Sequence, residues 1–245
     1  MVFRRSMLVA SLGCLPAMRS PAVQAADGSL ELDRLGSFEV VLGRPGTVIG
    51  VPHGTPDAGT LDVGRLLSEK LGVGGVFATG FWDPKTRERI NINRPTEQLI
   101  DPNSEVLRQW RSDHAVALNL RYEEGVREAA QQPLKAFYQI RSNHMPQHAG
   151  SIEVSTLGVT RGEAARFKAA FEAARDRLLP DVPRVAVHVS PIDRVTYLNY
   201  HAASSISALS RKGCATDQPG HLYSNQAWRH AYAECLAEAI GTARW

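Results

Sequence analysis

Short apolar runs alternate with amphipathic stretches along most of this chain. The pattern predicts a buried strand over residues 48–51, an amphipathic helix over 60–71 and a second buried strand over 75–79. Thr60 can cap the first turn of the helix, and Gly72 can end it. A strand, a helix and a strand at this spacing predict a βαβ unit.

The rest of the chain continues the alternation of strands and helices. We expect an edge strand within 27–42, strands over 136–140, 151–157, 184–190 and 221–224, and helices over 103–131, 162–179, 195–210 and 226–240. Val106 and Trp110 are among the apolar positions of the long helix. This order predicts one α/β domain over residues 26–245, a three-layer sandwich around a mixed, mostly parallel sheet.

Composition agrees with a globular domain and excludes two classes of partner. The chain has 245 residues, of which 43% are hydrophobic and 22% charged, as in ordinary folded proteins. The net charge is only +3, and no basic block is interleaved with aromatic residues, so we expect no nucleic-acid partner. No apolar run approaches the roughly 18 residues of a membrane span.

The first residues have the pattern of an export signal. Arg4 and Arg5 precede a short apolar stretch over residues 7–18, and small residues follow up to Ala25. We therefore predict a signal peptide over residues 1–25 and a periplasmic or secreted protein.

Two cysteines, Cys214 and Cys235, lie beyond the predicted signal peptide. In an oxidising compartment they could form a disulfide, and in a reducing one they would be small core residues. The sequence leaves both alternatives open.

The first candidate site follows the strand over residues 48–51, where a turn rich in proline and glycine carries His53 and Asp57. A loop at the end of a buried strand is a common place for reactive groups in α/β proteins. An imidazole and a carboxylate on one turn can bind a divalent cation. The alternative is a structural turn, in which His53 caps a backbone group and Asp57 makes an Asx-turn.

A second informative stretch spans residues 91–97. In a strand, Asn91 and Asn93 would face the same side, and Arg94 at the strand end could present its planar fork to a carboxylate. These groups are suited to binding an acidic small molecule or a chain end. The alternative is an edge strand with a surface arginine.

Two further stretches carry candidate groups. The strand that begins near residue 136 ends in polar residues, among which His144 is either another metal ligand or a loop histidine. Glu153 lies in an otherwise apolar strand. A carboxylate there is either paired with an arginine or raised in pKa and available as a base.

Taken together, these stretches resemble the N-formylglutamate amidohydrolase-like family, whose members are relatives of the zinc carboxypeptidases. The resemblance covers about residues 48–171. It rests on four motifs, Pro52-His-Gly-x-x-Asp57, Arg89-Ile-Asn-Ile-Asn-Arg-Pro-Thr-Glu97, Tyr138-Gln-Ile-x-x-Asn143 and Ser151-Ile-Glu-Val-x-Thr156.

The resemblance implies a Zn²⁺-dependent amidohydrolase or carboxypeptidase-like hydrolase of an acidic N-acyl amino acid or a peptide end. His53 and Asp57 would bind the zinc ion, and Asn93 and Arg94 would bind the substrate carboxylate. A water molecule on the zinc would attack the amide, and a glutamate would accept its proton. Glu153 is the candidate for that glutamate.

Two positions depart from the family pattern. Arg141 lies where the family carries a histidine ligand, and an arginine cannot bind a cation because it stays protonated. Tyr223 lies where the family tends to carry a glutamate. Either Arg141 turns away, with Glu153 as its expected partner, and His144 replaces the missing ligand, or Arg141 and Arg94 form a cationic pocket. The second case would make the chain a non-catalytic relative that binds an acidic ligand.

Overall fold

The computed structural model describes residues 36–243, apart from 56, 58, 84, 101–105, 144–147, 183, 197–208, 224 and the side chains of His221 and Tyr223. Three predictions therefore lie outside the described residues, namely the signal peptide, the ligand role of His144 and most of the helix expected over 195–210. In the part of the chain that is described, no helix is long and apolar enough to cross a membrane.

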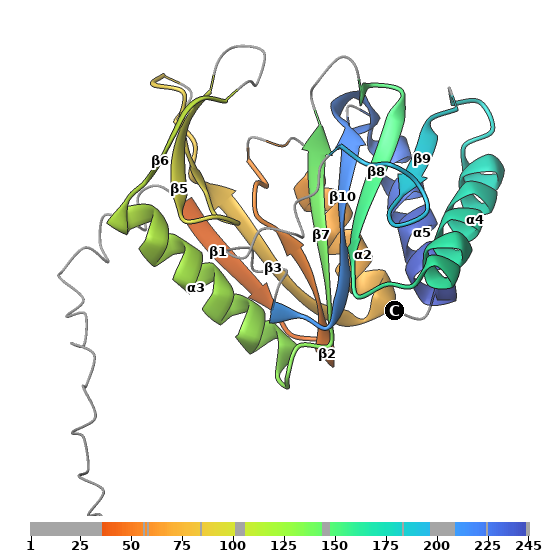
Figure 1. Cartoon of the computed structure of the whole chain (residues 1–245), viewed down its shortest axis with the longest axis horizontal. Helices are drawn as coiled ribbons and strands as arrows, with labels where there is room; N and C mark the ends of the chain where they lie inside the picture. Colours follow the sequence, from red (N-terminus) through yellow and green to blue (C-terminus); the bar gives the residue numbers. More distant parts are fainter. Residues whose placement is uncertain are drawn as a thin grey trace, which may run out of the picture.

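A seven-stranded sheet forms the centre of the molecule (Figure 1). Its order is β1 (Gly36–Val41), β3 (Val73–Gly80), β2 (Arg44–Val51), β7 (Ala136–Asn143), β10 (Lys212–Pro219), β8 (Ser151–Leu157) and β9 (Ala186–Val189). Strands β3, β2, β7 and β10 run parallel, as do β8 and β9, whereas β1 is antiparallel to β3 and β8 to β10. The predicted mixed, mostly parallel sheet is confirmed.

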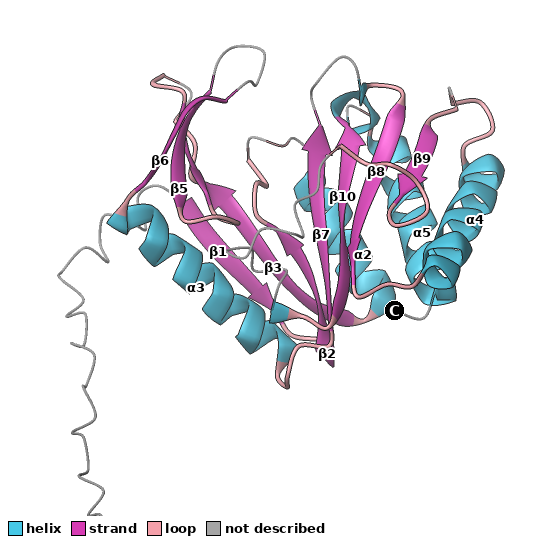
Figure 2. Ribbon diagram, in the orientation of Figure 1, coloured by secondary structure: helices cyan, strands magenta, loops and turns pink. Residues whose placement is uncertain are grey.

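Helices cover both faces of this sheet, which gives the predicted three layers (Figure 2). The helices α2 (Thr60–Leu71), α4 (Arg161–Leu178) and α5 (Gln226–Ala243) share one apolar core with the sheet. The helix α3 (Asp113–Ala130) covers the opposite face through a second apolar cluster. Cys214 and Cys235 are buried in the first core as free thiols, which agrees with small core residues.

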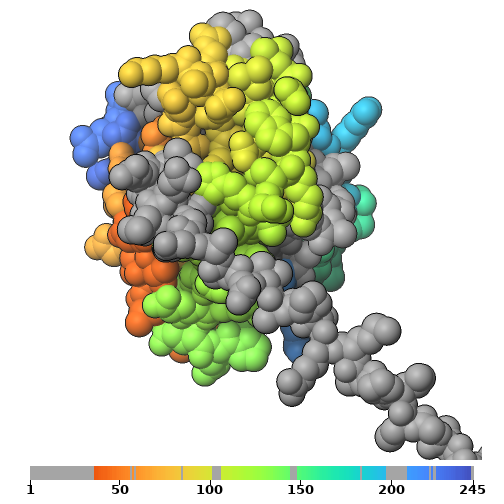
Figure 3. All heavy atoms as spheres, turned by 90° about the vertical axis from the view of Figure 1, so that its left-hand side faces the viewer, coloured from red at the N-terminus to blue at the C-terminus, as the bar shows by residue number. Residues whose placement is uncertain are grey.

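A second, smaller sheet lies next to α3. It contains β4 (Glu88–Asn91), β5 (Thr96–Ile100) and β6 (Val106–Arg111), all antiparallel. In Figure 3, which shows the left-hand side of Figure 1, the yellow and yellow-green atoms of this sheet lie exposed above the green atoms of α3. The helix contacts β4 and β5 and so joins this sheet to the main one.

The helix predicted over residues 103–131 is wrong in its first part. Val106 and Trp110 belong to β6, which pairs with β5, and α3 begins only at Asp113. The Ser112 hydroxyl accepts a hydrogen bond from the Ala115 amide at 3.0 Å and caps the helix. Local periodicity could not show that residues 106–111 pair with a neighbouring strand.

The sequence also missed β10 and predicted a strand over residues 221–224 in its place. The structure has a short 3₁₀ helix at Gly220–Tyr223. β10 contains small and polar residues instead of an apolar run, yet it lies between β7 and β8 and pairs with both. Its stability comes from these neighbours, which no local pattern shows.

Gly50 of β2 allows the sheet to pack closely under α3. A Cβ atom at this position would lie 2.4 Å from Phe137 Cζ and 2.6 Å from the Tyr122 hydroxyl oxygen. We therefore expect Gly50→Ala to lower the free energy of unfolding by about 1–3 kcal/mol, the range for overpacking a core. Urea-induced unfolding measures the change.

The control for Gly50→Ala is Gly162→Ala on α4. Gly162 is exposed, and the only atom near its added Cβ would be Arg166 Nη1 at 3.7 Å. This variant should be as stable as the wild type or slightly more stable, because alanine favours helix over glycine. Equal losses in the two variants would contradict the packing argument.

Candidate functional site

A row of polar side chains crosses the main sheet on the face that α3 covers elsewhere. Arg141 on β7 pairs in register with Asp217 on β10, which in turn pairs with Glu153 on β8. Residues paired in register project to the same face of a sheet, together with residues two positions away. We call this group the polar floor. Its members are Gln139, Arg141, Asn143, Asp217, Glu153 and Ser155.

The polar floor is possible because α3 covers only part of its face. The helix packs against β1, β2 and β3 and buries apolar side chains there, such as Val48 and Val76. The polar floor lies on the neighbouring strands β7, β10 and β8. Apart from Arg141, its side chains are almost completely buried. Buried polar groups must find partners to be tolerated.

The strongest contact within the polar floor joins Arg141 to Asp217. Arg141 Nε lies 3.0 Å from Asp217 Oδ1, and Nη2 of the same guanidinium also donates to Oδ1. The exposed fractions of the two side chains are 12% and 2%. Burial raises the pKa of the Asp217 carboxyl, whereas the positive charge of Arg141 acts in the opposite direction.

The expectation that Arg141 would turn onto Glu153 is therefore corrected. Its partner is Asp217, which stands directly opposite it on the adjacent strand. Glu153 lies one strand further on and contacts other groups. Its Oε2 accepts a hydrogen bond from the Thr196 amide at 2.7 Å, and its Oε1 lies 3.5 Å from His148 Nδ1. The role of Glu153 as a base stays a prediction.

His53 and Asp57 lie in the turn after β2, as predicted. The Asp57 amide donates to the His53 carbonyl at 3.0 Å, and the Thr60 hydroxyl donates to the Asp57 carbonyl at 2.7 Å, where α2 begins. The Ser142 amide donates to Asp57 Oδ2 at 3.3 Å. The carboxylate thus reaches the end of the neighbouring strand β7, next to Arg141.

The positive charges of three arginines act on His53. Burial is the main reason why the pKa of His53 lies well below its ordinary value, and the positive charges of Arg89, Arg141 and Arg94 lower it further. The charge of Arg141 also lowers the pKa of both Arg89 and Arg94, after burial as the main cause. Three separate segments therefore bring their positive charges to one place, and His53 is neutral there at pH 7.

Arg94 reaches this place from a turn and not from a strand end. β4 ends at Asn91, and the Arg94 amide donates to the Asn91 carbonyl at 2.9 Å, which closes the turn between β4 and β5. The expected arrangement of Asn91 and Asn93 along one strand is therefore wrong. Both side chains are nonetheless buried, with exposed fractions of 8% and 2%. The roles of Asn93 and Arg94 in substrate binding stay predictions.

Sequence reasoning missed three residues of this region. Asp217 was invisible because β10 itself was not predicted. Arg89 begins the motif over residues 89–97, but the local sequence does not indicate that its charge acts on His53. Its Nε donates to Gln98 Oε1 at 2.9 Å. His148 lies beyond the end of β7, where no local pattern indicates its contact with Glu153. Only the folded chain brings these groups together.

A zinc ion is not accommodated by the described residues alone. His53 and Asp57 are two possible metal ligands. Arg141 lies where the N-formylglutamate amidohydrolase-like pattern has a histidine ligand, and it is paired with Asp217. No group of three or more histidine, cysteine, aspartate or glutamate side chains that could hold a metal ion is found in the described part of the chain. The third predicted ligand, His144, lies outside it.

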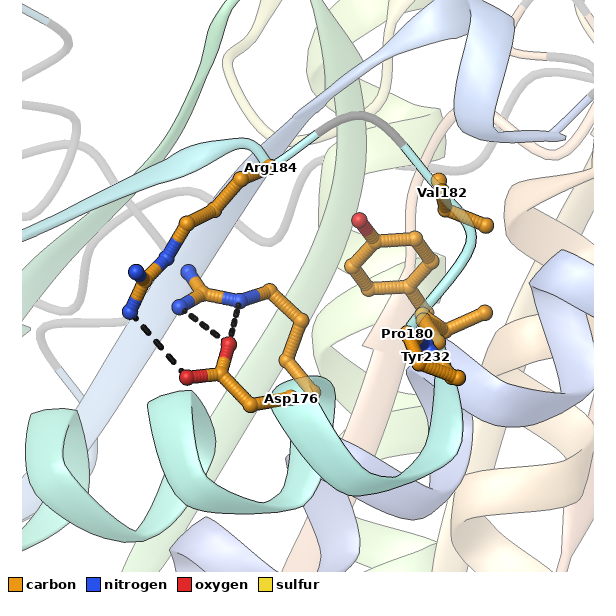
Figure 4. A pocket seen from close by; sticks show the side chains of 7 residues that line it. Asp176, Pro180, Val182, Arg184 and Tyr232 are labelled. Carbon is orange, nitrogen blue, oxygen red and sulfur yellow. Dashed lines mark hydrogen bonds and ion pairs between the residues drawn. The ribbon is translucent and has the colours of Figure 1, made fainter.

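A cavity of about 210 Å³ lies elsewhere, between α4, α5 and the segment before β9 (Figure 4). Its charged groups bind one another. Arg175 donates to Asp176 at 2.8 Å and to the Val185 carbonyl at 2.7 Å, and Arg184 donates to Asp176 at 3.1 Å. These contacts join α4 to the segment before β9, so the charged groups of this cavity stabilise the fold.

Comparisons with known proteins show the fold. No family profile matches the chain, and no curated protein does. A bacteriophage poly-gamma-glutamate hydrolase has a similar structure, with a TM-score of 0.50 and 12% identity over 84% of this chain and 88% of that one. The gene product Atu2144 of Agrobacterium tumefaciens has a TM-score of 0.48 and 16% identity over 85% and 94% of the two chains.

The zinc-free apo form of YNDL is also similar, with a TM-score of 0.48 and 12% identity over 86% of this chain and 92% of that one. At 12% identity, the match to the poly-gamma-glutamate hydrolase shows a shared α/β fold and leaves the activity open. The narrower resemblance to the N-formylglutamate amidohydrolase-like family stays a prediction.

The low pKa of His53 predicts how stability depends on pH. The unfolded chain binds a proton to this histidine near pH 6.5, whereas the folded chain binds it only at lower pH. Stability should therefore be unaffected by His53 above pH 6.5 and should fall below it, by up to about 1.4 kcal/mol per pH unit. Urea-induced unfolding at pH 7.5, 6 and 5, with a chelator present, measures this.

His53→Gln should remove part of this pH dependence, because glutamine does not titrate. The matched control is His230→Gln on the exposed side of α5, which should leave the pH dependence unchanged. If both variants lose stability with acid as steeply as the wild type, His53 does not cause the pH dependence.

Proposed function

We propose that this chain hydrolyses an amide bond in an acidic N-acyl amino acid or at a peptide end, in the pocket around His53. The observation that carries the proposal is the contact between the Ser142 amide and Asp57 Oδ2 at 3.3 Å, which places Arg141 beside the turn that carries His53. The positive charges of Arg89, Arg94 and Arg141 lower the pKa of His53, which agrees with this placement. Arginine binds carboxylates through parallel hydrogen bonds, and partial burial strengthens such contacts.

The three arginines differ in their position and burial. Arg141 forms an ion pair with Asp217. Arg89 donates a hydrogen bond to Gln98, and the negative charge of Asp57 raises the pKa of Arg89. Arg94 lies at the tip of a turn and is only half-buried. We therefore assign the substrate carboxylate to Arg94, with Asn93 next to it. Arg141 would add positive charge from the polar floor.

The reaction class is supported by the fold and by the chemistry of the polar floor. The fold is shared with a protein named as a poly-gamma-glutamate hydrolase, whose name also implies cleavage of an amide in an acidic substrate. Glu153 is the proposed proton acceptor for an attacking water molecule. Its side chain is buried next to Asp217 on the adjacent strand, which reduces its contact with bulk water.

The narrower part of the proposal is that zinc is the cofactor, bound by His53, Asp57 and His144. A neutral imidazole is the form that binds a metal, and the low pKa of His53 favours that form. Export to the periplasm or the medium, based on the first 25 residues, also belongs to the proposal.

A second function is favoured by one specific contact. The ion pair between Arg141 and Asp217 occupies the position where the related family carries a histidine ligand. A chain that keeps this pair and lacks a third ligand would bind the acidic molecule without cleaving it. Zinc content and hydrolysis separate the two functions.

Arg94→Ala should weaken the binding of an acidic ligand such as N-acetylglutamate by roughly 2–5 kcal/mol, the range for breaking a buried charge pair. Isothermal titration calorimetry in the presence of a chelator measures the affinity. Arg108→Ala is the matched control, because Arg108 lies on the same small sheet but is exposed. If Arg94→Ala and Arg108→Ala bind as well as the wild type, Arg94 does not hold the carboxylate.

Zinc analysis tests the cofactor. Hydrolytic zinc sites usually have three protein ligands. If His144 is the third ligand here, the purified chain should bind about one zinc ion. His144→Ala should then lose both zinc and hydrolysis of N-acetylglutamate, whereas His230→Ala should keep both. A zinc-free wild type that still binds the acidic ligand would favour the second function.

A further inference from the structure

Asp217 uses only one of its two carboxylate oxygens within the described structure. Both contacts from Arg141 go to Oδ1. Oδ2 is buried and accepts no hydrogen bond from any described residue. The whole residue has an exposed fraction of 2%. A buried carboxylate oxygen without a donor is unfavourable, because its hydration is lost and nothing replaces it.

The surroundings of Asp217 make a donor still more necessary. The negative charges of Asp57 and Glu153 act on the same carboxyl group and oppose its ionisation. Protonation would not solve the problem, since it would turn Oδ2 into a donor that also lacks a partner. A ligand that supplies an N–H group would satisfy the oxygen.

The location of Asp217 connects this oxygen with the turn that carries His53. Asp217 binds Arg141, and the next residue, Ser142, donates its amide to Asp57 Oδ2 at 3.3 Å. The charge of Arg141 also acts on Arg94. A ligand whose carboxylate is bound by Arg94 would therefore lie next to the polar floor. In an N-acyl amino acid, the amide nitrogen is bonded to the same carbon that carries the carboxylate, so both groups can be bound at once.

We propose that Asp217 determines specificity by accepting a hydrogen bond from an N–H group of the bound acid through Oδ2. The ligand class is then an acid with a free amide N–H or ammonium group next to its carboxylate, and not the corresponding ester. This inference rests on the proposed function, because it assumes that an acid is bound near Arg94.

The test compares two ligands that differ in one atom. N-acetylglutamate has an amide N–H, and 2-acetoxyglutarate has an ester oxygen in the same place. The wild type should bind the amide at least about tenfold more tightly, as expected for a hydrogen bond to a charged acceptor. Asp217→Asn keeps an oxygen for Arg141 but presents NH₂ in place of Oδ2. This variant should lose the preference for the amide.

Ser155→Ala is the matched control, because Ser155 lies on the same face of the sheet but two residue pairs away from Asp217. It should keep the preference. Free glutamate, measured in parallel, shows whether an ammonium group is bound more tightly than an amide. Both results agree with the proposal, since both groups donate N–H.

The outcomes separate this inference from the proposed function. If the wild type binds both ligands equally well, the acid is bound but Asp217 accepts no hydrogen bond from its N–H group. This result overturns the inference. If neither ligand binds, the proposed function itself fails. Should Asp217→Asn not fold, the amide proton of ¹⁵N-labelled N-acetylglutamate bound to the wild type decides. Slow exchange with solvent would support the hydrogen bond, and free exchange would overturn it.

Discussion

The buried ion pair between Arg141 and Asp217 is the contact on which the candidate site depends. Two charges that are nearly excluded from water stabilise one another only when they remain together, and the removal of either one leaves an uncompensated charge. The pair also joins the two strands β7 and β10 at their carboxyl ends. It therefore fixes the positions of the neighbouring carboxylates and of the positive charge near His53.

The incomplete cover of one sheet face explains why such a pair exists. α3 packs on β1, β2 and β3, and the small sheet β4–β6 extends from it. The apolar side of the main sheet is filled by α2, α4 and α5. This leaves the polar floor on β7, β10 and β8 outside the area that α3 covers. One face of the main sheet is thus filled by apolar packing, and the other carries the polar residues of the candidate site.

The charges of the site are nearly balanced, which limits what it can bind. Arg89, Arg94 and Arg141 oppose the entry of a further cation, since at about 4 Å a like charge costs on the order of 4 kcal/mol in a partly screened site. The carboxylates of Asp57, Asp217 and Glu153 offset this repulsion. A molecule with both a carboxylate and a polar hydrogen matches such a pattern better than a simple ion.

The sequence by itself determined the α/β class, the βαβ unit around residues 48–79, and the place of His53 and Asp57 in the turn after a buried strand. These features follow from local periodicity and turn residues, which act over a few positions. Only the tertiary structure decided that residues 106–111 form β6, that β10 lies inside the sheet and that Asp217 faces Arg141. Strand pairing joins residues far apart in the chain, such as Arg141 and Asp217, and no local pattern contains that information.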